Sequence, residues 1–157
     1  MMKKVSIWTD GACSYNPGPG GWAAILQYGK AEKVLSGGKN ETTNNVMELT
    51  AVVEGLKALK EKCSVLLYSD SAYVVNAVEQ GWLHNWKANG FRTADKKPVK
   101  NRELWEELDA LLSEHAVKFI KVKGHADNEY NNRCDSIARS EVEKLSADKN
   151  NARTDEL

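Results

Sequence analysis

Apolar and polar residues divide the chain into short apolar runs and longer stretches with a helical period. Three short runs near the N-terminus, KKVSIWTD, GGWAAILQY and KAEKVLSGG, have the composition of strands and are joined by turns that contain glycine. Such connections predict an antiparallel meander of three strands. After them, Val46, Leu49, Val53 and Leu56 recur at helical spacing, which predicts a helix within residues 40–62.

The remainder of the chain continues this alternation. The run SVLLYSD, residues 64–70, is almost entirely apolar, as expected for a strand covered on both faces. A last strand is predicted at AVKFIKVKG, residues 116–124, and an irregular connection at GFRTADKKP, residues 90–98. Helices are predicted over residues 71–80, 82–86, 101–115 and 128–145.

The predicted order is therefore βββαβαααβα. The helix between the third and fourth strands predicts that the fourth strand lies parallel to the first, reached by a right-handed crossover. These features define an α/β fold whose mixed five-stranded sheet combines three antiparallel and two parallel strands, with helices on both faces. No repeat or linker divides the chain, so we expect one domain over residues 1–145 and a polar tail, 146–157, that frays.

Composition narrows the class of protein without revealing its activity. With 41% hydrophobic and 28% charged residues, the chain is globular and not generally disordered. No apolar run reaches the roughly 18 residues of a membrane span, and no secretory signal is recognisable, so we expect a cytoplasmic protein. The three cysteines lack any C-x-x-C spacing, which favours free thiols over disulfides or zinc. Nothing in the sequence requires more than a monomer.

Two aspartates stand where apolar strands end. Asp10 follows KKVSIWT and Asp70 follows SVLLYS. If the two strands are parallel neighbours, about 4.8 Å apart, both carboxylates emerge on one rim of the sheet, where open α/β sheets bind ligands. Two such charges about 4 Å apart repel by roughly 4 kcal/mol at an effective dielectric of 20. A divalent cation relieves that repulsion, and oxygen ligands suit magnesium or manganese.

Two further carboxylates extend this set. Glu48 shares a predicted helix face with Val52 and Gly55, which should pack on the sheet, so its charge must reach the rim. Asp135 lies on the last predicted helix and completes a cluster of four. The alternative for Asp70 is a capping role, because an aspartate before SAYVV is a suitable helix N-cap.

Four segments resemble the motif blocks of type 1 ribonuclease H. They are TDGACSYNPGPGGW, TTNNVMEL, YSDSAYV and GHADNEYNNRCDSIA, and their order and spacing agree with that family over about residues 3–143. The segment WLHNWKANGFRTADKKPVKNRELW also resembles the basic protrusion of bacterial members, here within residues 80–102. The resemblance implies the ribonuclease H-like fold.

The resemblance further implies an activity and its residues. Family members are endonucleases that hydrolyse the RNA strand of RNA–DNA hybrids with two magnesium ions, leaving 5′-phosphate and 3′-hydroxyl ends, and manganese is a second candidate ion. Asp10, Glu48, Asp70 and Asp135 match the metal-binding carboxylates. His125 matches a histidine with a role in proton transfer or product release; a structural, hydrogen-bonded histidine is the alternative.

The glycine-rich loop after Asp10 is expected to border the minor groove of the hybrid. In the family, backbone groups near Cys13 and the side chain of Asn16 touch sugars and base edges. The amides of Asn16, Asn44 and Asn45 suit a 2′-hydroxyl, which both donates and accepts. A tight hairpin turn is the alternative for the loop.

Two further residues match contacts of the family to the DNA strand. Thr43 matches a residue that grips a DNA-strand phosphate, and Asn101 is a candidate for the same pocket. Helix capping offers an alternative for Thr43 and Asn44, because both stand at the start of a predicted helix.

A basic segment stands out in a chain whose 22 basic and 22 acidic residues cancel. Between residues 87 and 102 there are six basic residues and one acidic residue, a net charge of +5. Counterion release from phosphates and packing of rings on sugars or bases favour a hybrid-binding surface. The alternatives are a solvated charged face and tryptophans that belong to the core, as expected for Trp105. The predicted contacts are Trp82, Trp86, Lys87, Lys96 and Lys97.

Two positions depart from the family pattern, and two other functions compete with hydrolysis of hybrids. Glu41 stands where some relatives are basic, and Ala72 where others are polar, so the grip on substrate is weakened there while the carboxylates are intact. A module that binds hybrids without cutting them is one alternative. Another nuclease of this fold is the second, but Gly11 and Ala12 after Asp10 exclude the D-x-E pair of proofreading exonucleases.

Overall fold

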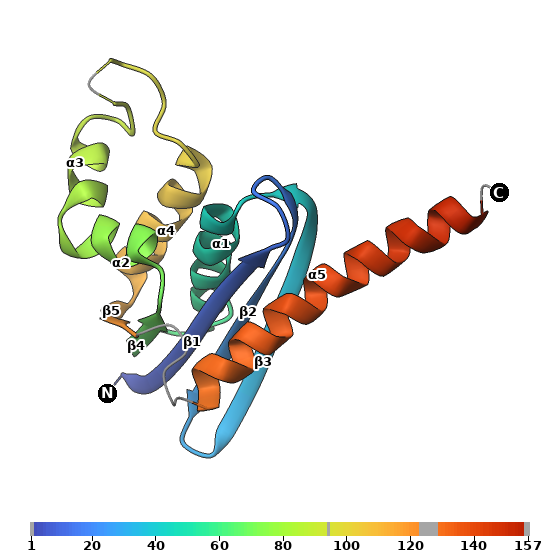
Figure 1. Cartoon of the computed structure of the whole chain (residues 1–157). Coiled ribbons are helices and arrows are strands. Elements are labelled where there is room, and N and C mark those ends of the chain that lie inside the picture. Colours follow the sequence, from blue (N-terminus) through green and yellow to red (C-terminus); the bar gives the residue numbers. More distant parts are fainter. Residues whose placement is uncertain (1, 94, 123–128, 156–157) are drawn as a thin grey trace.

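The computed structural model describes residues 2–93, 95–122 and 129–155. In these residues the strands and helices follow the predicted order (Figure 1). The strands are β1 (Lys3–Cys13), β2 (Gly18–Tyr28), β3 (Ala31–Thr42), β4 (Cys63–Ser69) and β5 (Ala116–Lys121). The helices are α1 (Asn44–Lys57), α2 (Ala72–Glu79), α3 (Trp82–Ala88), α4 (Arg102–Glu114) and α5 (Glu129–Asp155).

The five strands form one mixed sheet in the order β3-β2-β1-β4-β5. β1, β2 and β3 pair antiparallel, whereas β4 pairs parallel with both β1 and β5. The predicted fold class and the parallel pairing of the first and fourth strands are therefore confirmed. This pairing matters for the site because it brings the carboxyl ends of β1 and β4 to the same edge of the sheet.

Helices cover both faces of the sheet, as predicted (Figure 1). Because side chains alternate along a strand, Ile7 of β1 faces the core beneath α1, α2 and α4, whereas Trp8 faces α5. On the α5 side, Gly21 lies directly against the carbonyl oxygen of Ala138, where a β-carbon would clash. Buried cores on both faces hold the central strands in place.

Three boundaries differ from the predicted ones. β1 continues past Asp10 to Cys13, because its last residues still pair with β2 after β4 has ended. β2 already begins at Gly18, which shortens the connecting loop to residues 14–17. Helix α5 continues to Asp155, well past residue 145, because no glycine or proline interrupts it and Ala147 and Ala152 favour helix.

The segment between α3 and α4 forms the predicted irregular connection. Its ends meet where Arg92 and Pro98 form an isolated bridge and the Val99 N–H donates to the Phe91 carbonyl. Trp105 is fully buried beneath this segment, with its ring centroid 5.2 Å from that of Trp86. The expectation that Trp105 belongs to the core is confirmed.

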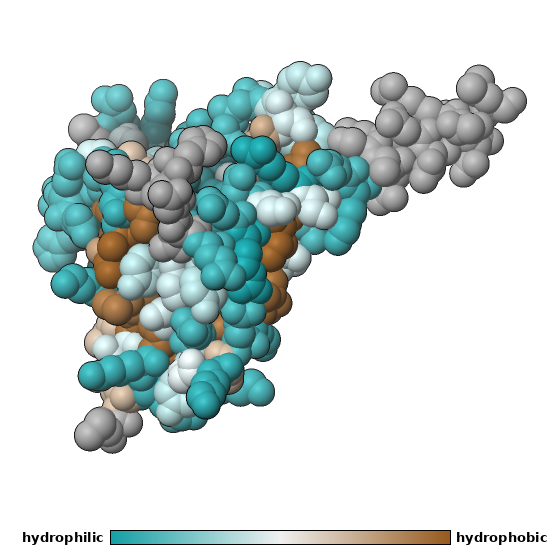
Figure 2. Space-filling model, turned by 60° about the horizontal axis from the view of Figure 1, so that its bottom comes forward, coloured by the Kyte–Doolittle hydropathy of each residue, from teal (hydrophilic) through white to brown (hydrophobic). Residues whose placement is uncertain are grey.

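Polar side chains cover most of the molecular face in Figure 2, and apolar atoms surface only in bands between them. In the described part of the chain, no helix combines the length and the apolar character needed to cross a membrane. All three cysteines are free thiols, as expected; Cys63 and Cys134 are buried and Cys13 is partly exposed.

Candidate active site

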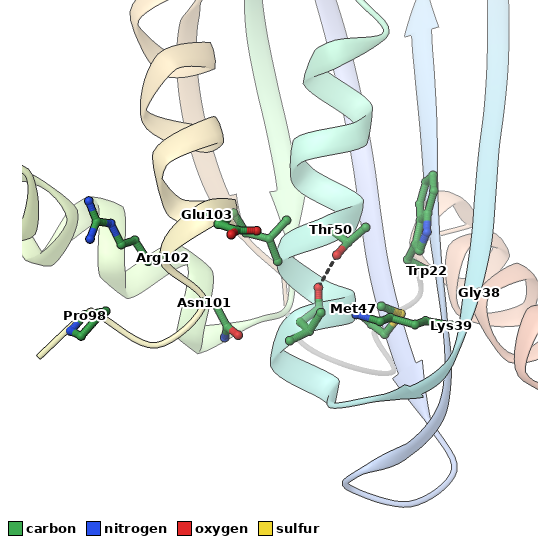
Figure 3. A pocket seen from close by; sticks show the side chains of 11 residues that line it. Trp22, Gly38, Lys39, Met47, Thr50, Pro98, Asn101, Arg102 and Glu103 are labelled. Carbon is green, nitrogen blue, oxygen red and sulfur yellow. Dashed lines mark hydrogen bonds between the residues drawn. The ribbon is translucent and has the colours of Figure 1, made fainter. Parts of the chain in front are cut away.

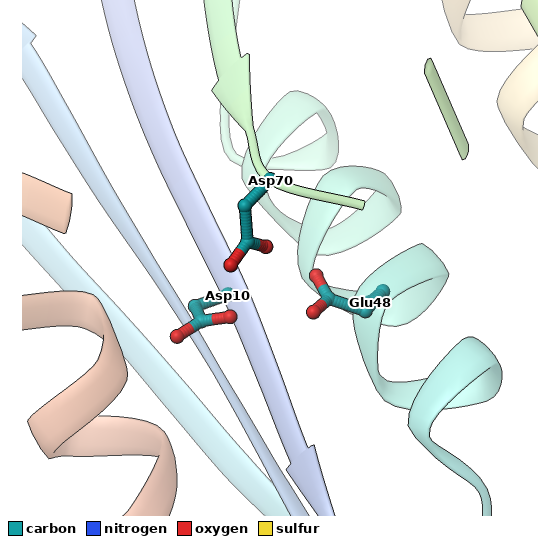
Figure 4. Close-up of side chains that lie close together, drawn as sticks. All are labelled: Asp10, Glu48 and Asp70. Carbon is teal, nitrogen blue, oxygen red and sulfur yellow. The ribbon is translucent and has the colours of Figure 1, made fainter. Parts of the chain in front are cut away.

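Asp10 and Asp70 occupy equivalent heights on neighbouring parallel strands. The last paired residues of β1 and β4 are Trp8 and Tyr68, and each aspartate follows its strand's member of that pair by two residues. Figure 4 shows both carboxylates reaching into the same space from the two strands. The prediction that they share one rim of the sheet is therefore correct.

Glu48 joins them from the first turns of α1. Its side chain points at Asp10 and Asp70 in Figure 4, while Val52 and Gly55 farther along the helix are buried against the sheet. The helix approaches β1 closely at Gly11, where a β-carbon would lie only 2.5 Å from the Glu48 nitrogen. The glycine after Asp10 thus allows the third carboxylate to reach the other two.

The three carboxylates form a compact oxygen cluster. Asp10, Glu48 and Asp70 each offer an oxygen, and these oxygens all lie within 4.8 Å of one another. Among the described residues, Oε2 of Glu48 is buried without a hydrogen-bond partner. A cation would satisfy that oxygen, and a donor set made only of oxygens fits a hard divalent ion.

The cluster shifts the ionisation of its members. Burial is the largest of the effects that raise the pKa of Asp10 to about 7. The charge of Asp70 and, less strongly, that of Asp135 also raise it, while a hydrogen bond from the Gly11 N–H lowers it. Burial also raises the pKa of Glu48 well above its usual value, with the charges of Asp10 and Asp70 adding to it. The three clustered carboxylates therefore repel one another, and a bound cation would relieve that repulsion.

Asp135 lies at the edge of this cluster rather than inside it. It lines the same cavity of about 500 Å³ as the other three carboxylates, but its Oδ2 lies 3.2 Å from Nε of Arg139, one helical turn farther on. Asp135 is not part of the compact group of three oxygens among the described residues. Arg139, on the same helix, thus already supplies a positive charge to Asp135.

Three residues of α5 at this cavity were missed in the sequence, namely Asn131, Asn132 and Arg139. Asn131, which is 5% exposed, and Arg139 both line the cavity with Asp135. Asn131, Asp135 and Arg139 are spaced four residues apart, so they share one face of the helix. That spacing was the signal that could have identified them.

The structure shows which of the predicted site residues cap a helix. Ser71, not Asp70, caps α2, since its hydroxyl accepts from the Val74 N–H. Thr43 does cap α1, because its hydroxyl accepts from the Val46 N–H. The capping alternative is therefore wrong for Asp70 and correct for Thr43.

The loop that begins after β1 is tied to the start of α1. Oδ1 of Asn16 accepts from the Asn44 N–H at 3.2 Å. Asn44 and Asn45 line the cavity of the carboxylates, whereas Cys13 lines an adjoining one. The predicted minor-groove residues thus lie on one continuous surface with the cluster.

The predicted contacts of the basic segment differ in their exposure to solvent and in their contacts within the protein. Lys96 and Lys97 are exposed, and Trp82 is 40% exposed. Lys87 is also exposed and forms an ion pair of 3.1 Å with Asp109, whereas Trp86 is partly buried against the core. All three lysines and Trp82 are therefore open to solvent, and Lys87 in addition pairs with Asp109.

A second cavity, of about 690 Å³, lies between α1, β3 and the start of α4 (Figure 3). Lys39, Asn101 and Arg102 are among its lining residues, and the Asn101 side chain donates to the Tyr73 hydroxyl at 3.0 Å. Thr43 does not line it. His125, the remaining predicted residue, lies outside the described part of the chain.

Comparisons with known proteins agree with this fold and site. The family model described as RNase H matches residues 2–143. A ribonuclease H of Acetivibrio thermocellus is 61% identical over 145 residues, covering 92% of this chain and 99% of the relative. A ribonuclease H of Chlorobium phaeovibrioides is 60% identical over 144 residues, covering 92% and 99%.

Solved structures show the same fold. LC9-RNase H1, described as a type 1 RNase H with the type 2 active-site motif, superposes with a TM-score of 0.82 at 24% identity, over 92% of this chain and 74% of that one. LC11-RNase H1 in complex with an RNA/DNA hybrid gives 0.68 at 23% identity, over 89% and 97%. Fold and carboxylate site define a nuclease of the ribonuclease H class. The chain belongs to the RNase H family.

Proposed function

We propose that this protein is an endonuclease that hydrolyses the RNA strand of RNA–DNA hybrids and leaves 5′-phosphate and 3′-hydroxyl ends. The observation that carries the proposal is the cluster of Asp10, Glu48 and Asp70, whose oxygens converge within 4.8 Å on a strand edge. Relatives named ribonuclease H, at about 60% identity over most of the chain, support the same activity.

The carboxylates would hold two divalent ions, for which we propose Mg²⁺, with Mn²⁺ as a substitute. Asp10, Glu48 and Asp70 form the compact ligand set, and Asp135 stands beside them at the same cavity. When bound, such ions make the attacking water acidic enough to act at neutral pH and stabilise charge on the phosphate and on the leaving 3′ oxygen. The chain's own part is to hold these oxygens in place on two strands and a helix.

Nearby residues would orient the hybrid. Asn44 and Asn45 line the carboxylate cavity, and an amide both donates to and accepts from a 2′-hydroxyl, which distinguishes RNA from DNA. Cys13 and Asn16 extend this surface along the loop. We propose that Thr43 and Asn101 contact the DNA strand, and that His125 transfers a proton or aids product release.

The basic segment would provide the remaining grip. Lys96 and Lys97 are exposed and attract phosphates by releasing counterions, while the exposed part of Trp82 offers a ring face. Lys87 can add a phosphate contact beside its ion pair with Asp109, because its ammonium has three donors and is exposed, and Trp86 acts mainly by supporting the segment. We further propose that the enzyme works as a cytoplasmic monomer.

A module that binds hybrids without cutting them is the competing function, and one assay separates the two. End-labelled RNA is supplied as hybrid, single strand and RNA duplex, beside DNA duplex, with magnesium or with EDTA. Magnesium-dependent cleavage of RNA in the hybrid alone supports the proposal, and ligation of the products reports their ends. Tight hybrid binding without cleavage would establish the binding module instead.

A further inference from the structure

The side chain of Tyr15 is unusually open to solvent. It is 76% exposed, the largest value among the exposed large hydrophobic residues of the described chain, ahead of Tyr28 at 49%. Tyr15 lies in the loop of residues 14–17 that joins β1 to β2. Because the ring makes little contact with the core, it is open to pack against a ligand outside the chain.

The loop holds Tyr15 in a fixed position. The Ser14 N–H donates to the Pro19 carbonyl at 2.9 Å, and the Cys13 thiol donates to the Tyr15 carbonyl. The backbone and Cβ of Tyr15 pack so closely on Gly18 that a β-carbon there would lie 2.8 Å from Cβ of Tyr15. The ring is therefore presented by an ordered backbone, which lowers the entropy cost of binding with it.

A groove connects this loop to the carboxylates. A cavity of about 440 Å³ runs along the end of β1 to Ser14, the neighbour of Tyr15. It shares Gly11, Asn44 and Asp135 with the cavity of the cluster. At the rise of a strand, Asp10 and Cys13 are about 10 Å apart, so the groove leads from the cluster to the neighbour of Tyr15.

We propose that Tyr15 is a substrate-binding residue whose ring packs on a sugar or base face in the minor groove of the hybrid, beyond the cleaved bond. This inference rests on the proposed function. Aromatic rings pack on nucleotides of any sequence, and the loop carries no charged side chain between Cys13 and Pro19. The contact therefore adds affinity without adding dependence on salt.

The test is hybrid binding by Tyr15→Ala, Tyr15→Phe and Tyr28→Ala, each combined with Asp10→Asn so that no cleavage interferes. Tyr28 is the matched control, because it is also exposed and ends β2 about 33 Å away from the start of that strand. We expect Tyr15→Ala to raise the Kd for a labelled hybrid about five- to tenfold. The phenylalanine and Tyr28 variants should match their parent.

The salt dependence and the kinetics complete the test. The slope of log Kd against log salt should be the same for Tyr15→Ala and its parent, because no phosphate contact is lost. In the otherwise unaltered enzyme, Tyr15→Ala should raise KM and leave kcat unchanged. A parent that binds hybrid tightly while Tyr15→Ala binds it equally well overturns this inference alone; a parent that does not bind hybrid overturns the proposed function with it.

Discussion

Gly11 lies against the backbone of Glu48 so closely that a β-carbon on Gly11 would stand 2.5 Å from the Glu48 nitrogen and 2.6 Å from the Met47 carbonyl carbon. Because Gly11 has no side chain, α1 can pack directly against the backbone of β1 one residue after Asp10. The helix delivers Glu48 to the two aspartates because of this contact. Gly11 therefore has a packing role at the active site.

Replacing Gly11 with alanine should separate activity from stability. We expect Gly11→Ala to displace the start of α1, to destabilise the protein by about 1–3 kcal/mol through overpacking, and to lower kcat more than tenfold. Gly29→Ala is the control, because Gly29 has a φ of +58° and open space around it. It should cost about 1–2 kcal/mol of stability with normal kcat. Denaturant unfolding and steady-state cleavage measure both; equal kcat for the two variants would contradict the account.

The raised pKa of Asp10 makes the metal-free protein less stable as pH rises. Between its ordinary value of 3.8 and about 7, the folded state holds the proton of Asp10 more tightly than the unfolded state does. Stability contributed by that proton is therefore lost across this window and stays absent above it. Asp10→Asn removes the loss, so in EDTA at pH 8 it should be more stable than wild type by about 1–3 kcal/mol.

Urea unfolding in EDTA at pH 5 and pH 8 checks this expectation. The advantage of Asp10→Asn should shrink at pH 5, where the wild-type carboxyl is protonated. Glu79→Gln, at the exposed end of α2, serves as a control for the loss of one carboxylate away from the cluster. An Asp10→Asn variant that is no more stable than wild type at pH 8 would show that the cluster carries no repulsion.

Metal binding should be coupled to proton release. Because Asp10 has a pKa of about 7 and that of Glu48 is also raised, a cation must displace protons to bind at or below neutral pH. Magnesium affinity is expected to fall steadily as pH drops below 7. Calorimetry in buffers of different ionisation enthalpy counts the protons released. A pH-independent affinity between 5.5 and 8 would oppose this picture.

Charge reversal on the basic segment should change binding more than chemistry. Lys96→Glu with Lys97→Glu should raise KM, reduce the salt dependence of hybrid binding and leave kcat nearly unchanged, since both lysines are exposed and distant from the carboxylates in sequence. The matched control is Lys30→Glu with Lys33→Glu. Both residues are exposed; Lys30 lies in the β2–β3 turn and Lys33 near the start of β3. If both double variants show the same salt slope, the segment does not bind phosphates.

Sequence reading succeeded where one local rule decides the outcome. The apolar run of β4 and the helical period of α1 were enough to predict these two elements. The parallel pairing of β1 and β4 predicted that Asp10 and Asp70 lie together. It failed where a second element decides: β1 runs on to Cys13 because β2 continues to pair with it, and the pairing of Asp135 with Arg139 was not foreseen. Such partners are set by the fold, not by the residue's own neighbours in the chain.

The most direct test of the central claim compares wild type with Asp10→Asn on one labelled RNA–DNA hybrid, measuring cleavage in magnesium and binding in parallel. We expect Asp10→Asn to lose cleavage by at least about a thousandfold while its Kd for the hybrid and its folding remain close to those of wild type. An Asp10→Asn enzyme that cuts the hybrid at nearly the wild-type rate would contradict the assignment of the carboxylate cluster as the catalytic site.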